Sequence, residues 1–193
     1  MTNDRFHVHK LYYDAIDDLR ISLRWMARDI ENDEIARCRR DGVPYVPFRY
    51  ANGDTRKQLL ARAKYILTKH ASRWTKSQQW RADIIFEFYP ELKKAYDLAL
   101  ELTDIFNRRV DKDVARLNLA RWYNKVDEMD GGQFQTVTET FRNHYDTILN
   151  YFINRSTNAG AESFNAKVKV FRSQFRGVAD IPFFLFRLSK LCA

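Results

Sequence analysis

Apolar side chains recur every three or four residues through most of this 193-residue chain, and this spacing limits its fold more than any other feature. Such a period places apolar groups on one face of an α-helix, whereas a half-buried strand alternates at every second residue. The stripes comprise Tyr12, Ile16, Leu19, Leu23, Met26 and Ile30; Leu92, Ala95, Ala99, Leu102 and Phe106; Ala115, Leu119, Trp122 and Val126; and Phe134, Val137, Phe141, Tyr145, Ile148 and Phe152. We therefore predict a mainly α-helical fold in which these stripes form a packed core.

Loop formers and capping residues mark the expected ends of these helices. Residues 42–54 are predicted to form a loop, because they contain Gly42, Pro44, Pro47 and Gly53. Asp54 is the expected N-cap of a helix running to about His70, and Thr75 can cap a short aromatic helix that ends before Pro90. Pro90 suits the first turn of the next helix, and Asp111 opens another.

The composition excludes several classes of protein. With 6 Gly and 4 Pro, the chain is neither collagen-like nor disordered. No stretch approaches the roughly 20 apolar residues of a membrane helix, and the N-terminus lacks a signal-peptide core, so we expect a cytoplasmic protein without a membrane partner. The two cysteines, Cys38 and Cys192, can form at most one disulfide and cannot hold zinc unaided.

Positive charge is concentrated near the C-terminus. The net charge is +8, and residues 153–193 contribute +5 of it, whereas the first 152 residues are close to balanced. The basic residues of this segment are Arg155, Lys167, Lys169, Arg172, Arg176, Arg187 and Lys190. This distribution favours a polyanionic partner such as DNA, bound by the C-terminal segment.

Two constellations of polar residues could carry chemistry. In the first, Asp4 and His7 are three residues apart and could face one site; alternatively, Asp4 caps the first long helix and His7 lies in its first turn. His9 adds little, because it does not share a helical face with His7.

The second constellation is centred on Glu162. On a helix from about residue 158 to 171, the side chains of Asn158, Glu162, Asn165 and Lys169 share one face. A carboxylate there could bind Mg²⁺, while the nearby amides and cations hold the DNA backbone. The alternative is an ordinary solvated helix face. The candidate DNA-binding residues are Arg155, Asn158, Asn165, Lys167, Lys169, Arg172 and Arg176, and the candidate metal ligand is Glu162.

The residues around Glu162 also carry a resemblance. The segment 155–169, followed by 171–178 and 183–188, resembles the C-terminal end of the ISL3 family of insertion-sequence transposases. The opening Asp4-Arg5-Phe6-His7-Val8-x-Lys10-Leu11 resembles a block in the middle of the same proteins, and the intervening helices fit that family's long insertion. The resemblance covers essentially the whole chain, and the Glu162 block is its specific part.

The resemblance implies a DDE transposase, in which a ribonuclease-H-like core holds two Asp and one Glu around two Mg²⁺ ions. Glu162 would be the third acid, although Ala159 and Ser163 stand where the family often has glycine. Asp4 would be either the second catalytic acid or, with His7, part of an Asp-x-x-His motif that follows it. Such enzymes generate a 3′-hydroxyl at a transposon end and use it to attack target DNA.

The first catalytic Asp of the family lies well before the Asp-Arg-Phe-His block, and only three residues precede Asp4 here. We therefore expect a C-terminal part of a transposase: residues 1–41 as a core-derived motif and long helix, 42–152 as a helical insertion, and 153–193 as the last helices of an incomplete ribonuclease-H-like core. Because a two-metal site needs several carboxylates, the isolated chain is expected to lack strand-transfer activity. The apolar residues 181–188, if uncovered, would favour self-association.

Three functional hypotheses follow. The first is a transposase fragment that acts on transposon ends and target DNA. The sequence leaves open whether such a fragment is an active enzyme by itself. The second is a non-catalytic helical DNA-binding protein or transposase remnant, and the third is a structural helical protein without a nucleic-acid role. Mg²⁺-dependent nicking that requires Glu162 separates the first from the second, and DNA binding at low salt separates the third from both.

Overall fold

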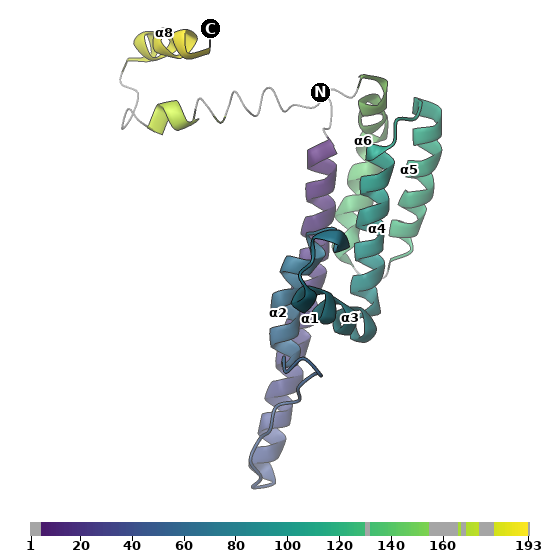
Figure 1. Cartoon of the computed structure of the whole chain (residues 1–193), viewed down its shortest axis with the longest axis vertical. Coiled ribbons are helices and arrows are strands. Elements are labelled where there is room, and N and C mark those ends of the chain that lie inside the picture. The colour runs from purple at the N-terminus through teal and green to yellow at the C-terminus, as the bar shows by residue number, and fades with distance from the viewer. Residues whose placement is uncertain (1–4, 130–131, 155–165, 167–168, 174–179, 193) are drawn as a thin grey trace. The chain divides into compact units, whose positions relative to one another are not determined.

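The computed structural model of the chain describes residues 5–129, 132–154, 166, 169–173 and 180–192, and within these ranges every regular element is a helix. The chain divides into two compact units, Met1–Asn154 and Arg155–Ala193. The elements are α1 (Arg5–Arg40), α2 (Arg56–Leu67), η1 (Ala71–Arg73), α3 (Lys76–Phe88), α4 (Pro90–Asn107), α5 (Lys112–Asp127), η2 (Gly132–Phe134), α6 (Gln135–Asn154) and α8 (Ile181–Cys192) (Figure 1). The predicted mainly α-helical fold is confirmed for these residues.

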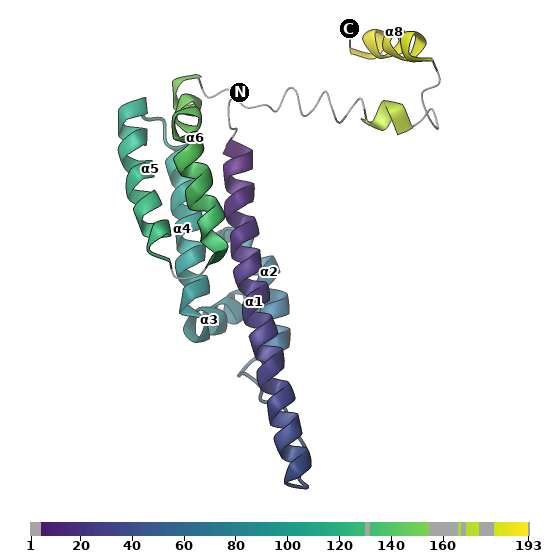
Figure 2. The same cartoon turned by 180° about the vertical axis from the view of Figure 1, so that it is seen from behind.

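The core of the first unit lies where α4, α5 and α6 pack beside the N-terminal half of α1 (Figures 1 and 2). The stripe residues predicted for α4 and α5 are all buried there. Polar atoms of buried aromatic side chains find backbone partners, as buried donors must. The Trp122 indole N–H donates to the Leu98 carbonyl at 2.8 Å, and the Tyr12 hydroxyl donates to the Ala95 carbonyl at 3.1 Å. The Tyr12 and Trp122 ring centroids are 5.3 Å apart.

Local capping chemistry sets where several of these helices begin. Thr75 caps α3, and its hydroxyl and the side chain of Gln78 form a reciprocal capping box. Pro90 occupies the first turn of α4. The carboxylate of Asp111 accepts hydrogen bonds from the backbone N–H groups of Asp113 and Val114 in the first turn of α5. These three predicted helix starts are confirmed.

The prediction for Asp54 was wrong, because Thr55 is the N-cap of α2 and forms a capping box with Gln58. Asp54 is 3% exposed, and its carboxylate pairs with Arg62 of α2 and with Arg81 of α3, whose Nε lies 2.8 Å from Oδ2. Both residues are competent caps in sequence. Because the Asp54 carboxylate is buried in an ion pair with Arg81 of α3, Thr55 occupies the N-cap position instead.

The apolar stripe of α1 is only partly buried, which corrects the prediction that all of it belongs to the core. Met26 is 57% exposed and Ile30 is 47% exposed, although Tyr12, Ile16 and Leu19 are buried. The reason is that the C-terminal half of α1 extends past the ends of α4 and α6, so neither of these helices of the first unit covers this face (Figures 1 and 2). This half of α1 packs instead against α2.

Ion pairs supplement the contact between α1 and α2. Arg56 Nη1 lies 2.9 Å from Glu34 Oε1, and Lys57 pairs with Glu31. Each of these α1 acids is therefore neutralised by a cation of α2. Within the described residues, no helix is long and apolar enough to cross a membrane.

Candidate nucleic-acid interface

The N-terminal constellation is only partly within the described residues. His7 is exposed in the first turn of α1, whereas Asp4 lies outside the described residues. Two residues further on, His9 is half-buried, and its ring centroid lies 5.4 Å from that of Phe106. Burial, together with the nearby guanidinium of Arg5, lowers the pKa of His9 to about 4. The His9 imidazole is therefore neutral at pH 7 and serves the packing of α1 on α4.

The C-terminal constellation is represented by two of its cations. Lys169 and Arg172 are exposed within a helical stretch at 169–173. The remaining predicted residues of this site, Glu162, Arg155, Asn158, Asn165, Lys167 and Arg176, lie outside the described residues.

An aromatic contact joins the helical stretch that carries these two cations to α8. Phe171 is buried, and its ring centroid lies 5.4 Å from that of Phe184 in α8. At the start of α8, the Asp180 carboxylate accepts a hydrogen bond from the backbone N–H of Phe183 at 2.9 Å. Because Phe171 turns inward, Lys169 and Arg172 remain at the surface of this unit.

The helix α8 combines cations with exposed aromatic rings. The Arg187 guanidinium lies 6.0 Å from the Phe183 ring centroid, and the Lys190 ammonium lies 5.8 Å from that of Phe186. Both rings are more than half exposed. Cations that follow a phosphate backbone, with aromatic faces beside them, are typical of surfaces that bind nucleic acid.

The two-metal site that the resemblance implies is not represented among the described residues. No three Asp, Glu, His or Cys side chains within this part of the chain cluster closely enough to hold a metal ion. Asp4 and Glu162 lie outside it. A metal-binding role for this chain thus depends on Glu162, which the sequence alone proposes.

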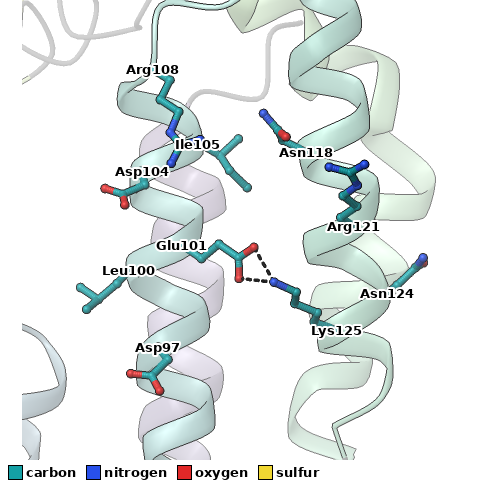
Figure 3. Close-up of a pocket in the computed structure, with 10 residues that line it drawn as sticks. All are labelled: Asp97, Leu100, Glu101, Asp104, Ile105, Arg108, Asn118, Arg121, Asn124 and Lys125. Carbon is teal, nitrogen blue, oxygen red and sulfur yellow. Dashed lines mark hydrogen bonds and ion pairs between the residues drawn. The ribbon is translucent and has the colours of Figure 1, made fainter.

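A groove of about 660 Å³ lies between α4 and α5, and none of its lining residues is a predicted site residue (Figure 3). Its charged lining is mixed: the Lys125 ammonium donates to both Glu101 carboxylate oxygens at 2.7 and 2.9 Å. The other lining residues are Asp97, Leu100, Asp104, Ile105, Arg108, Asn118, Arg121 and Asn124. Since three acids face three cations here, this groove offers little attraction to a polyanion.

A second cationic surface escaped the sequence analysis. Residues 20–81 hold 15 Lys and Arg against six Asp and Glu, a net charge of +9, whereas residues 82–152 hold nine against 13, a net charge of −4. A count over the first 152 residues averages these two segments and hides the asymmetry. In the structure, a depression of about 390 Å³ within the basic segment is lined by Arg20, Ile21, Arg24, Trp25, Arg28 and Lys57. Counting the net charge over shorter stretches of the sequence would have identified this basic segment.

Comparison with protein families gives one match. Residues 1–188 match the model of a DDE family of the ISL3 type, which is described as a transposase. The comparison with curated proteins and the comparison with solved structures each gave no match.

Proposed function

The chain belongs to the ISL3 family of DDE transposases, and from this premise we propose that it serves DNA transposition by metal-dependent phosphodiester cleavage and strand transfer. The observation that carries the proposal is the extent of the family match, which includes both the opening block with Asp4 and His7 and the block around Glu162. Its partners would be transposon ends and target DNA, and its place of action the cytoplasm.

In this proposal the C-terminal segment holds DNA next to Glu162. The exposed cations Lys169 and Arg172 bind backbone phosphates, assisted by Arg155, Lys167 and Arg176, while Asn158 and Asn165 donate hydrogen bonds beside the carboxylate. Glu162 would hold Mg²⁺, and the bound ion would supply Lewis-acid stabilisation of the oxygens that react. Asp4 is either a second acid of this site or, with His7, a neighbouring motif.

We propose the domain organisation that the sequence suggested. Residues 1–41 and 153–193 belong to a ribonuclease-H-like core, and residues 42–152 form a helical insertion between them. Because a two-metal site needs further carboxylates, we propose that this chain alone does not transfer strands. The exposed Ile181, Phe183 and Phe186 of α8 would support self-association or contact with the rest of such a core.

A nicking assay on supercoiled plasmid tests the catalytic part of the proposal. The full chain, with and without Mg²⁺, is compared with Glu162→Gln, which keeps the shape of the side chain but removes its charge. Mg²⁺-dependent nicking that Glu162→Gln abolishes would establish the catalytic role of Glu162. Nicking that survives the substitution would refute that role. Any nicking that depends on Glu162 would also contradict the proposal that the isolated chain is inactive.

The alternative is a DNA-binding protein without chemistry. The exposed cations Lys169, Arg172, Arg187 and Lys190 favour it. It predicts that DNA binding is unaffected by Mg²⁺ and by Glu162→Gln, with no nicking under any condition.

A further inference from the structure

One face of the C-terminal half of α1 carries exposed cations and apolar groups, and Lys57 of α2 lies at its edge. Ile21, Trp25, Arg28 and Arg39 follow one another at spacings of four, three and eleven residues, which keeps them on one face of the helix. Arg24 borders the same face, one residue before Trp25. Trp25 is 52% exposed, and Arg24, Arg28 and Arg39 are exposed as well.

Two of the four acids in this half of α1 form ion pairs with α2. Glu31 and Glu34 pair with Lys57 and Arg56 of α2. No acid lines the depression beside Trp25, where Lys57 joins Arg24 and Arg28. Asp29, which lies 3.6 Å from Arg28, is the nearest carboxylate to these guanidinium groups. Asp17, Asp29 and Glu31 pair with three of the four cations that line the depression, so Arg24 contributes most of its unpaired positive charge.

Trp25 positions one of these cations. The Arg28 guanidinium carbon lies 4.0 Å from the Trp25 ring centroid, within the range of a cation–π interaction. A guanidinium stacked in this way keeps its N–H groups directed outward along its plane, where they can meet phosphate oxygens. This explains why a large aromatic side chain stays exposed in a basic environment.

We propose that this face of α1, with Arg24, Arg28 and Arg39, is a second DNA-binding surface that contacts the phosphate backbone of duplex DNA. From Arg24 to Arg39 the helix covers about 22 Å, and a DNA strand carries one phosphate per about 3.4 Å, so the face can follow several consecutive phosphates. The choice of DNA rests on the proposed function, whereas the location rests on the charge and exposure of these residues. The surface is separate in sequence from the C-terminal cations by more than 120 residues.

The test is fluorescence anisotropy of the full chain with a labelled 30-bp duplex at several salt concentrations. The triple variant Arg24→Gln/Arg28→Gln/Arg39→Gln should bind about 10- to 100-fold more weakly at low salt. The slope of log affinity against log salt should fall by about 2 to 3, because each lost phosphate contact removes about 0.9. Trp25→Ala should weaken binding by a smaller factor, about twofold to fivefold, by freeing Arg28.

The matched control removes three exposed cations from the acidic segment, as Arg109→Gln/Arg116→Gln/Arg121→Gln. It changes the net charge equally and should alter affinity less than the α1 variant by at least fivefold. Equal losses in the two triple variants would overturn the proposal in favour of a general charge effect. Thermal unfolding of each variant followed by circular dichroism checks that the helices are retained.

A second pair of substitutions separates this inference from the proposed function. Lys169→Gln/Arg172→Gln alters the C-terminal cations alone. If this variant loses affinity and the α1 variant does not, the second surface is refuted while the proposed function stands. If the wild-type chain binds no duplex at low salt, both fall. Displacement of the duplex by poly-glutamate at equal charge concentration would overturn the assignment to DNA.

Discussion

The basic segment, residues 20–81, and the acidic segment, residues 82–152, belong to one unit of the chain but use the same helical periodicity in opposite ways. In the acidic segment every predicted stripe residue of α4 and α5 is buried. In the basic segment the α1 stripe is half-buried at Leu23 and exposed at Met26 and Ile30. An apolar stripe becomes core only where another helix faces it.

Replacing one tryptophan in each segment tests this comparison most strongly. Trp122→Ala should lower the free energy of unfolding by roughly 3–5 kcal/mol, because it empties a fully buried site and removes the hydrogen bond to Leu98. Trp25→Ala should cost less than about 1 kcal/mol, since the ring is half exposed. Chemical denaturation followed by circular dichroism measures both. Similar losses would show that the Trp25 face is part of the folded core.

Asp54 tests how the basic segment is held together. Asp54→Ala should lower the free energy of unfolding by about 2–3 kcal/mol, because it leaves the half-buried Arg81 guanidinium without its partner. The loss should fall short of that for a fully buried pair, since Arg62 is exposed and can be hydrated. Asp97→Ala, which removes an exposed acid paired with Lys93, is the matched substitution in the acidic segment and should cost under about 0.5 kcal/mol. Equal effects would contradict the buried role of Asp54.

His9 reports on the contact between α1 and the acidic segment through its pH dependence. Its pKa is lowered in the folded state, so the unfolded chain binds the proton more tightly and stability falls as the pH drops from about 6.5 towards 4. Between pH 7 and pH 5 this amounts to about 2 kcal/mol. In His9→Leu that part of the pH dependence should vanish, as measured by urea denaturation at each pH. An unchanged profile would show that the imidazole is accessible to water.

The comparison also shows which features were predictable from sequence. The helix starts at Thr75, Pro90 and Asp111 were predicted because capping depends on neighbours in the chain. Asp54 was assigned wrongly because the competing residue, Arg81, lies 27 positions away and meets it only in the folded unit. The exposure of Met26 and Ile30 was missed for the same reason, since periodicity does not reveal where the facing helix ends.

For the candidate site, sequence and structure contributed different parts. The family assignment and the choice of Glu162 depend on residue identity and order, which the sequence holds completely. That Lys169 and Arg172 reach the surface depends on the packing of Phe171 against Phe184. The positive charge of the basic segment, residues 20–81, is also visible in the sequence. It was missed because the net charge was counted over the first 152 residues together.

The sequence by itself determined the helical fold class, most helix starts and the family, because each follows from short-range patterns of residue type. The tertiary structure alone decided which charges cancel. Glu31 and Glu34 of α1 pair with Lys57 and Arg56 across the α1–α2 contact, and Lys57 also lines the depression beside Trp25 together with Arg24 and Arg28. Coulomb attraction depends on distance in space rather than along the chain, so the field of this face exists only once α1 and α2 are packed together.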